Sequence, residues 1–319
     1  MTDTIALSDE NLSLNRSIGR YMLSYSVYSE AGGVGKTTLS ANLAVAHARA
    51  GLDVLIVPLD PQDGDLSYLF GVDHDRTDSG IDTLVHHLVD RANGEFRDLI
   101  RTTEHGVDIV PEHNRLEDLG EALRKERDAR SDFGESFPMW TQLQRVLRDA
   151  NTHQRYDVLI VDPPASSGPQ LYNALDATRN LVLPIEPSGK GQASVSGLDD
   201  LVTNLEGQLE ISIGVLAAVP NRVKGTRDQD AIIEEIETQG FDVPVIFGDR
   251  TSLLEGCWRK KCSAFTYVRE HRDRRREYEL DTLAQFDRLA RHLEATGSIT
   301  APNPPEPGSI ESDGAEVRV

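Results

Sequence analysis

The stretch EAGGVGKTT (residues 30–38) carries groups that bind phosphate: three glycines, one lysine and two threonine hydroxyls. The glycines allow backbone angles that a side chain would forbid, so that successive N–H groups can point at phosphate oxygens. A helix that begins near Lys36 would add the positive end of its dipole. We therefore predict a phosphate-binding loop, although a plain glycine-rich turn would have the same composition. The residues predicted to contact the ligand are Gly32, Gly33, Val34, Gly35, Lys36, Thr37 and Thr38.

Two acidic residues follow apolar strands and could complete a site for a divalent cation. The strand in YDVLIVDPP (156–164) ends in Asp162, which could hold the water shell of a Mg²⁺ ion that Thr37 also binds. A second strand leads to Asp60, which could orient the metal or an attacking water. Lys36 would contact the β- and γ-phosphates and, with Asp60, would be catalytic. The alternative is that Asp60 belongs to a solvated turn.

Three motifs in this order, GGVGKTT, LDPQDGDLSYLFG and DVLIVDPPASSGPQLYNAL, resemble the ParA/MinD family of P-loop ATPases over residues 22–297. The resemblance implies ATP and Mg²⁺ as ligands, ATP hydrolysis, and a homodimer that forms face to face around two ATP molecules. It also implies that Asn221, in AAVPNRV, recognises adenine, with Arg222 beside it and FGDR (247–250) as a second adenine-side loop. The sequence NRVK differs from the Asn-Lys-x-Asp pattern of guanine binders, which favours ATP over GTP.

Two departures from the family pattern bear on turnover. Ala31 stands where the family has its signature lysine, which reaches the phosphates of the neighbouring subunit, and Pro58 stands where the second motif has its first acid. Because a positive group of this kind can raise the rate of phosphoryl transfer by orders of magnitude, we expect slow hydrolysis. Lys190 could supply the missing charge or could simply face solvent. The alternative function is a nucleotide-dependent switch or regulatory scaffold that hydrolyses ATP barely or never.

The charge distribution combines an acidic chain with one basic segment. The 319 residues carry a formal net charge of −20, which argues against a general polyanion binder and resembles proteins of salt-loving organisms. Residues 259–276 nevertheless hold eight basic and two acidic side chains, a local charge near +6. Such a concentration suggests an anionic partner, and the family resemblance implies non-specific DNA binding, whereas pairing with the acidic surface is the alternative. The predicted DNA-binding residues are Arg259, Lys260, Lys261, Arg272, Arg274, Arg275 and Arg276.

These observations favour a role in plasmid or chromosome partition, in which an ATP-dependent dimer coats DNA and a ParB-like protein stimulates the ATPase.

We expect a cytoplasmic, nucleoid-associated protein, because no apolar run has membrane-spanning length and no signal-peptide pattern opens the chain. A MinD-like positioning ATPase is the rival, but the helix expected at 279–296 suits packing onto a sheet better than membrane binding. Cys257 and Cys262 fit no zinc or disulfide spacing and are expected to be free thiols.

The elements that must position these residues alternate between apolar strands and amphipathic helices. Near-continuous aliphatic runs such as DVLIV (53–57 and 157–161) are typical of parallel strands covered on both faces. We predict one α/β domain over 22–297, a doubly wound, mostly parallel sheet with helices on both faces, between a flexible leader (1–21) and a disordered acidic, Pro-rich tail (298–319). The expected strands are 22–28, 53–59, 107–110, 157–162, 180–184, 213–219 and 243–247, and the expected helices are 36–50, 80–90, 116–129, 138–149, 192–206, 228–238 and 279–296.

Overall fold

The structure is a computed structural model that describes residues 21–62, 65–187 and 192–310. The predicted leader except Tyr21, the loop residue Lys190 and residues 311–319 of the predicted tail lie outside these ranges. The described strands are β1 (Leu23–Val27), β2 (Val54–Pro58), β3 (Arg101–Thr102), β4 (Asp108–Ile109), β5 (Val158–Asp162), β6 (Asn180–Ile185) and β7 (Gly214–Pro220).

These strands form one sheet in the order β3-β4-β2-β5-β1-β6-β7. The β3–β4 pair is antiparallel and every other neighbouring pair is parallel. The carboxyl ends of the parallel strands therefore meet at one edge, with β1 near the middle of the sheet. This is the predicted doubly wound, mostly parallel α/β fold, and ligands of such folds bind at that edge.

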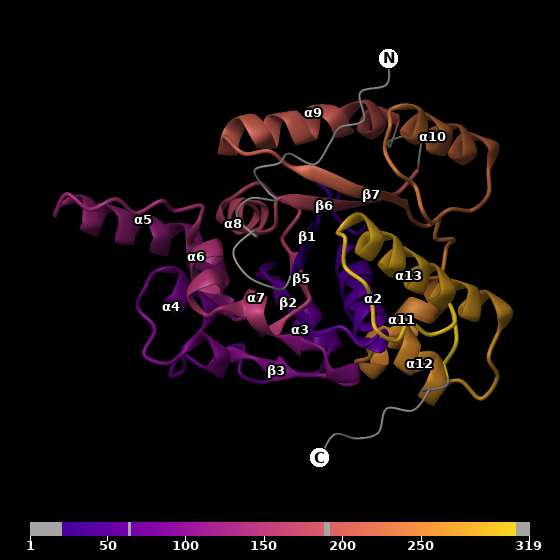
Figure 1. The fold of residues 1–319 in the computed structure, drawn as a ribbon, viewed down its shortest axis with the longest axis horizontal. Helices are drawn as coiled ribbons and strands as arrows, with labels where there is room; N and C mark the ends of the chain where they lie inside the picture. The colour runs from indigo at the N-terminus through magenta and orange to yellow at the C-terminus, as the bar shows by residue number, and fades with distance from the viewer. Residues whose placement is uncertain (1–20, 63–64, 188–191, 311–319) are drawn as a thin grey trace.

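Helices cover both faces of the sheet (Figure 1), with α11, α12 and α13 beside α2 on one side and α5, α6 and α8 on the other. The helices are α2 (Lys36–Arg49), α3 (Leu66–Leu69), α4 (Leu84–Leu88), α5 (Leu119–Ser131), α6 (Gln142–Asp149), α7 (Thr152–Arg155), α8 (Pro169–Thr178), α9 (Gln192–Leu209), α10 (Arg227–Thr238), α11 (Thr251–Lys260), α12 (Ala264–His271) and α13 (Glu277–Thr296), with 3₁₀ turns at η1 (Phe96–Leu99), η2 (Glu104–Gly106) and η3 (Asn114–Asp118).

The aliphatic strands are buried on both faces, as their sequences predict. In β2, Val54 and Ile56 belong to the core that includes residues of α2 and α13, whereas Leu55 and Val57 belong to the core formed with α4, α5 and α6. Successive side chains of a strand point to opposite faces, so a strand between two helical layers needs apolar residues at every position. Because the strands are buried on both faces, the positions of their ends are fixed. The residues that follow each strand are fixed with them.

The strand predicted at 243–247 is wrong. This segment runs beside β7 with only separate backbone hydrogen bonds, such as Phe247 N to Pro220 O and Ala218 N to Asp242 O, each 2.8 Å. Pro244 has no backbone N–H to donate, so a continuous ladder cannot form across it. The segment still brings Phe247 to the carboxyl end of β7.

Five helices were not predicted, the one-turn α3 and α7 and the longer α8, α11 and α12, and the predicted helix 80–90 is shorter, as α4. Helix α8 follows the turn PPASSG and begins at Pro169, a position where proline suits a helix because its missing N–H is not needed. Helix α11 ends in the basic segment and α12 lies within it, and the charges there obscure the apolar spacing. Ser263 begins α12, where its hydroxyl accepts a hydrogen bond of 3.2 Å from the backbone N–H of Thr266.

The prediction of a disordered tail from residue 298 differs from the structure, in which residues 298–310 pack against α2 and α13. Asn303 N donates to Ala50 O and Gly308 N donates to Asp287 Oδ2, both at 2.9 Å. Ala301 and Gly308 are buried. Composition predicted disorder because the segment has few apolar residues, but backbone hydrogen bonds hold it on the folded surface, and Ile299, Ala301 and Ile310 pack against the core.

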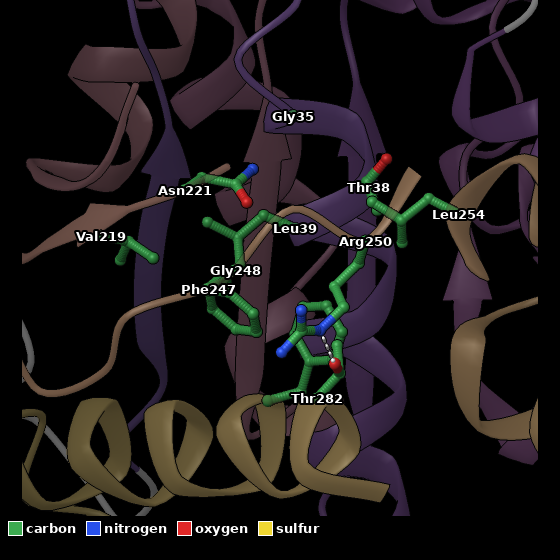
Figure 2. Close-up of a pocket in the computed structure, with 11 residues that line it drawn as sticks. Gly35, Thr38, Leu39, Val219, Asn221, Phe247, Gly248, Arg250, Leu254 and Thr282 are labelled. Carbon is green, nitrogen blue, oxygen red and sulfur yellow. Dashed lines mark hydrogen bonds between the residues drawn. The ribbon is translucent and has the colours of Figure 1, made fainter. Parts of the chain in front are cut away.

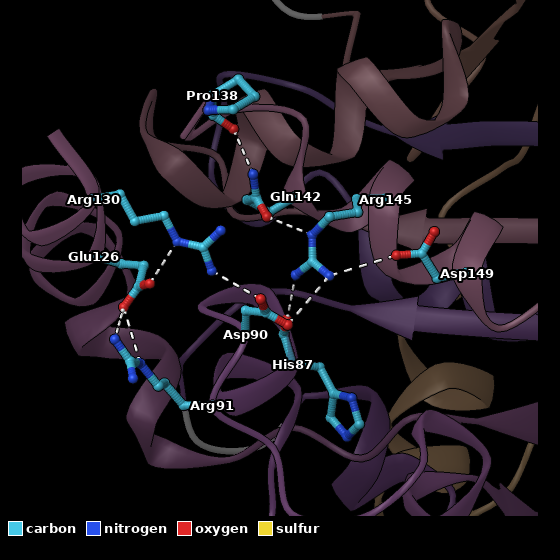
Figure 3. A network of polar contacts seen from close by, with 9 residues as sticks. All are labelled: His87, Asp90, Arg91, Glu126, Arg130, Pro138, Gln142, Arg145 and Asp149. Atoms are coloured by element: carbon cyan, nitrogen blue, oxygen red, sulfur yellow. Dashed lines mark hydrogen bonds and ion pairs between the residues drawn. The ribbon is translucent and has the colours of Figure 1, made fainter. Parts of the chain in front are cut away.

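A network of arginine–carboxylate contacts joins α4, α5 and α6 on the outer side of the sheet (Figure 3). Arg130 contacts Glu126 at 2.7 Å and Asp90 at 2.8 Å, while Arg145 contacts Asp90 at 3.8 Å and Asp149 at 3.6 Å. Each exposed pair contributes little stability, about 0–1 kcal/mol, but shared partners make a network that orients the three helices. Part of the acidic surface is therefore neutralised within the molecule.

Two further expectations concern α13 and the cysteines. The apolar stripe of α13, including Leu283, Phe286 and Leu293, is buried in the core beside α2, so this helix is not free to lie on a membrane. Within the described ranges, none of the helices has both the length and the apolar character needed to cross a bilayer. Cys257 and Cys262 are buried free thiols, as predicted.

Candidate functional site

The loop between β1 and α2 has the backbone that phosphate binding requires. Gly33 and Gly35 adopt φ values of 74° and 96°, which residues with side chains rarely adopt. A Cβ atom at Gly35 would also lie 2.6 Å from Nδ2 of Asn221. The same amide donates a hydrogen bond of 2.8 Å to the carbonyl oxygen of buried Val34. The residue that follows β7 therefore holds the predicted phosphate loop in place.

The first turn of α2 is suited to bind an anion. Gly35 precedes the helix without a side-chain capping bond, and this turn, which begins at Lys36, contains no acidic residue. The first amides of a helix have no partner within it and carry the positive end of the helix dipole. Thr37 and Thr38, both partly exposed, lie in the same turn. A phosphate group would satisfy these amides and hydroxyls.

Lys36 turns its ammonium group toward the loop. Its Nζ lies 3.4 Å from the carbonyl oxygen of Ala31, and the residue is 9% exposed. Burial lowers the pKa of Lys36, and the carboxylates of Asp162 and Asp60 act in the opposite direction. A largely buried ammonium that faces a neutral carbonyl lacks a full counter-charge, and a phosphate in the loop would supply it.

Asp162 ends β5 directly beside this loop. Its Oδ1 accepts a hydrogen bond of 3.0 Å from the hydroxyl of Ser40. Burial raises the pKa of Asp162 to about 7, although hydrogen bonds from Thr37 and Ser40 favour its ionised form. A carboxylate that is buried with so little counter-charge suits a place next to a cation. The residues present therefore fit a divalent ion at this position.

Asp60 reaches the same edge from the neighbouring strand. Pro58 of β2 pairs with Asp162 of β5, and Leu59 N donates to Asp162 O at 2.9 Å. The carboxylate of Asp60 accepts a hydrogen bond of 3.1 Å from Gln62 N. The structure thus brings Thr37, Asp60 and Asp162, the predicted Mg²⁺-side residues, to one place.

The protein alone does not build a metal cage at this edge. Among the described residues, no group of three or more His, Cys, Asp or Glu side chains is arranged to hold a metal ion. Mg²⁺ typically keeps several waters and takes one or two carboxylates together with the phosphates of its substrate. The sparse donor set therefore suits a magnesium ion that arrives with a nucleotide.

A cavity opens beside the phosphate loop, between the first turn of α2 and α13 (Figure 2). Leu39, Val219 and Phe247 give it apolar surface, and the amide of Asn221 lies above them. Apolar walls combined with a few polar groups suit a flat heteroaromatic ring. The lining residues are Gly35, Thr38, Leu39, Val219, Asn221, Phe247, Gly248, Arg250, Leu254, Thr282 and Phe286.

Only some of the residues predicted to contact the base line the cavity. Asn221 and the segment 247–250 both reach the cavity, with Phe247, Gly248 and Arg250 in its wall. Arg222, also predicted to bind the cofactor, is not among its lining residues. The φ of Arg222 is 59°, and its guanidinium pairs with Glu186 at 3.3 Å. The turn after Asn221 therefore directs this side chain away from the cavity.

Sequence reasoning missed two kinds of site residue. Ser40 also donates to the carbonyl oxygen of Lys36 at 3.1 Å, and its place one helical turn after that lysine was the available signal. Thr282 lines the cavity and accepts a hydrogen bond of 2.9 Å from Nε of Arg250 (Figure 2). Leu254 also lines it. These two residues come from α13 and α11, far along the chain, and no motif marks them.

The basic segment divides into internally paired and exposed side chains. Lys261 lies 3.2 Å from Asp73 and 4.1 Å from the ring centre of Tyr68, and Arg272 lies 2.7 Å from the buried Glu279. These two residues, predicted to bind DNA, are therefore engaged within the molecule. The remaining predicted residues are exposed and, in the part of the chain described, have no carboxylate within 4.0 Å: Arg259, Lys260, Arg274, Arg275 and Arg276.

The aromatic residues of this segment are structural. Phe265 and Tyr267 are 2% and 3% exposed. Trp258 stacks on Tyr68 with ring centres 6.4 Å apart. These rings do not offer free faces for nucleic acid bases, so the segment presents positive charge without aromatic stacking.

Comparison with known proteins agrees with this geometry. Residues 23–212 match the family model described as an AAA domain. The chromosome-partitioning ATPase Soj of Thermus thermophilus is 32% identical over 170 residues, which cover 53% of this chain and 57% of Soj. Among solved structures, a Cyanothece McdA variant in complex with ATP has a TM-score of 0.67 at 18% identity and covers 88% of this chain and 98% of its own.

The septum site-determining protein MinD of Pyrococcus horikoshii, complexed with Mg-ADP, has a TM-score of 0.63 at 20% identity and covers 86% of this chain and 97% of its own. The two solved structures share the fold, and the domain match extends over more than half of the chain. The chain therefore belongs to this AAA-domain family and, within it, to the ParA/MinD group of P-loop ATPases.

Proposed function

We propose that this protein is a ParA-like ATPase that binds ATP with Mg²⁺, dimerises, and binds DNA non-specifically in plasmid or chromosome partition. One observation carries the proposal: the phosphate loop, Asp60 with Asp162, and the apolar-walled cavity at Asn221 meet at one edge of the sheet. A nucleoside triphosphate has its base, phosphates and metal ion in that same spatial order. The name of the related Soj, a chromosome-partitioning ATPase, supports the role in partition.

The site residues have separate roles in this proposal. The amides of the loop and of the first turn of α2 bind the phosphates, and Lys36 neutralises the β- and γ-phosphates. Thr37, Asp60 and Asp162 face the metal, which when bound spreads the charge of the phosphates. Asp60 also orients the attacking water. Asn221 contacts the base, whereas Arg222 pairs with Glu186 and has no cofactor contact in this proposal.

Slow hydrolysis is part of the proposal. Ala31 is exposed at the mouth of the loop, and an alanine there cannot extend a charge to a neighbouring subunit. Loss of such a charge costs a P-loop enzyme orders of magnitude in rate. This observation also favours the second candidate function, a nucleotide-dependent switch that binds ATP and dimerises without turnover.

Five exposed basic residues support DNA binding. Arg259 and Lys260 end α11, and Arg274, Arg275 and Arg276 precede α13. We name these five the basic surface. It lies within a chain of net charge −20, so its attraction to DNA is local and acts on the phosphate backbone. In this role the protein acts in the cytoplasm at the nucleoid, and a ParB-like protein is its proposed stimulating partner.

Nucleotide binding and turnover test the proposal separately. Calorimetry with ATP and Mg²⁺ should register binding, and Lys36→Ala should weaken it roughly 10- to 100-fold, as expected for lost charge-assisted hydrogen bonds. Phosphate release should be slow, faster with DNA, and absent in Asp60→Ala, which should still bind ATP.

The outcomes distinguish the two candidates. If no heat is detected and Lys36→Ala behaves as the unmodified protein does, the chain is not a nucleotide-binding protein. If ATP binds but phosphate is not released with or without DNA, the switch replaces the ATPase.

A further inference from the structure

A buried polar cluster lies behind the turn that carries Asp60. At its centre is Arg76, whose side chain is 9% exposed. One terminal nitrogen, Nη2, donates to the carbonyl oxygens of Pro61 and, at 2.8 Å, Gln62. The other, Nη1, donates to Asp65 Oδ2 at 2.6 Å. Arg76 therefore contacts the two residues that directly follow Asp60 and the residue that begins the next helix, α3.

The Nε atom and the backbone carbonyl of Arg76 both contact Asn114, which lies in another loop at this edge of the sheet. Its Nε donates to Asn114 Oδ1 at 2.8 Å, and its carbonyl oxygen accepts a hydrogen bond of 3.1 Å from Asn114 N. Asn114 begins η3, a few residues after the carboxyl end of β4. The guanidinium thus joins the turn after β2 to the turn after β4, the neighbouring strand in the sheet.

Asp65, the carboxylate partner of Arg76, lies beside a second buried carboxyl group, that of Glu112. Glu112 is 2% exposed, and its Oε2 accepts hydrogen bonds from the N–H group, at 2.9 Å, and the hydroxyl of Ser67. Burial raises the pKa of Glu112 well above its usual range, and the neighbouring Asp65 raises it further. Burial beside the carboxylate of Asp65 therefore favours the protonated form of Glu112.

The shape of an arginine side chain suits it to hold the turn that carries Asp60. A guanidinium presents its donors in a rigid plane. The four acceptors that bind it, which come from three segments, are therefore held at fixed distances and in fixed directions relative to one another. The carbonyl groups of a surface turn can also bond to water, which would leave the turn free to move. A buried arginine that occupies the carbonyls next to Asp60 limits that movement.

We propose that Arg76 is a positioning residue for ATP hydrolysis. By fixing the carbonyl groups of Pro61 and Gln62, it fixes the direction in which Asp60 points toward the metal and the attacking water. Arg76 does not touch the nucleotide and acts through Asp60. The inference rests on the proposed function, because it assigns a role within hydrolysis.

The first test compares two buried arginines. Arg49 is a matched control, because its side chain is also 9% exposed and pairs with a buried carboxylate, Asp287, at 2.9 Å, between α2 and α13. Arg76→Gln should lower kcat about 100-fold, the loss expected when a catalytic group is misplaced by about 1 Å. Its dissociation constant for ATP with Mg²⁺ should stay within about threefold, because no nucleotide contact is removed.

Arg49→Gln should lower the melting temperature without lowering kcat by more than about twofold, because its ion pair lies away from the turn. Arg76→Lys should lie between the unmodified protein and Arg76→Gln, because lysine keeps the charge but cannot hold both carbonyls and Asn114 at once. If Arg49→Gln loses as much kcat as Arg76→Gln, or if Arg76→Gln loses affinity and kcat alike, the role of Arg76 is general stability.

A second measurement does not need turnover. Hydrogen exchange of the nucleotide-free protein should be faster at residues 59–62 in Arg76→Gln and unchanged there in Arg49→Gln. Unchanged exchange at residues 59–62 in Arg76→Gln overturns the inference even if the protein hydrolyses ATP. If the unmodified protein releases no phosphate, the proposed hydrolysis fails, while the exchange result still decides whether Arg76 holds the turn.

Discussion

At the scale of single residues, the phosphate loop depends on the close approach of Asn221 to Gly35. The amide of Asn221 bonds to the carbonyl of Val34 and occupies the space where a Cβ atom at Gly35 would lie. Asn221 also lies in the wall of the apolar-walled cavity. One asparagine therefore links the phosphate-binding part of the site to the base-binding part.

Gly35→Ala should weaken ATP binding at least about tenfold, because the new Cβ must displace the amide of Asn221 and the backbone must keep its left-handed conformation at a cost of about 1–2 kcal/mol. Calorimetry measures the affinity. Gly134→Ala is the matched control: its φ is also positive, 76°, but a Cβ atom there meets nothing within 4 Å. Equal ATP affinity in both variants would show that the contact with Asn221 does not matter.

Glu112 predicts a pH dependence of stability. Because its pKa is raised by burial, its contribution to folding is complete at low pH and is lost as the pH rises through that raised value. Glu112→Gln keeps a neutral group of the same shape that can donate to Asp65. The variant and the unmodified protein should have the same melting temperature at about pH 5. As the pH rises toward about 9, the variant should become the more stable of the two.

Glu294 provides a control with the opposite sign. Burial disfavours its ionised form, but hydrogen bonds from His47 and Arg291 lower its pKa overall. Its contribution is therefore present at neutral pH and is lost as the pH falls. Glu294→Gln should be less stable than the unmodified protein at neutral pH, with a smaller difference in acid. A difference for Glu112→Gln that stays constant with pH would contradict the raised pKa of Glu112.

At the scale of elements, the segment 298–310 acts as a strap across α2 and α13. It accepts a hydrogen bond from Arg49 through the carbonyl of Ser309 and donates to Asp287 through the N–H group of Gly308. Arg49 and Asp287 also pair with each other between the two helices. The strap therefore completes the polar contacts of an ion pair that is buried on one side of the sheet.

Deleting residues 298–319 should lower the free energy of unfolding by at least about 2 kcal/mol, because it removes three hydrogen bonds and leaves the Arg49–Asp287 pair partly unsatisfied. Denaturant unfolding measures the change. Deletion of 311–319 alone removes none of these contacts and serves as the control. If both deletions leave the unfolding midpoint unchanged, the predicted disorder from residue 298 describes the segment better than the packing does.

At the scale of the whole molecule, the distribution of charge sets how DNA can be bound. The chain carries −20, and several of its arginines are used in internal pairs such as those of Arg130 and Arg145. The basic surface is exposed and has no such pairs among the described residues. Attraction to DNA must then be short-range and strongly dependent on salt, because the net negative charge of the chain repels DNA at long range.

Replacing Arg274, Arg275 and Arg276 with alanine should abolish ATP-dependent DNA retention and leave ATP affinity intact. In the unmodified protein, the logarithm of the DNA association constant should fall linearly with the logarithm of the salt concentration. Each phosphate contact contributes a slope of about −0.9, so loss of three contacts should reduce the steepness by up to about 2.7.

The control for this variant removes the same charge elsewhere. Arg115, Arg124 and Arg148 are exposed on η3, α5 and α6. Their replacement with alanine changes the net charge equally but should leave the salt slope as it is. DNA retention that survives the first triple variant, or that is lost equally in both, would show that the basic surface is misassigned.

Contiguous patterns in the sequence predicted the core of the site and most of the fold. The phosphate loop, Asp60 and Asp162 each follow the carboxyl end of a strand, and parallel strands bring these ends to one edge. The strand prediction at 243–247 failed because Pro244 interrupts the ladder in a run that is otherwise apolar. Helix α8 was missed although Pro169 marks its start.

The sequence alone determined the local chemistry: a glycine-rich turn before a helix, acids after buried strands, and a basic segment in an acidic chain. Only the tertiary structure decided which of these groups meet. The pairing of Lys261 with Asp73, the strap over Arg49 and the hold of Arg76 on the turn at Asp60 join segments far apart in sequence. Residue spacing carries no information on such contacts, because they depend on how the helices and loops pack around the sheet.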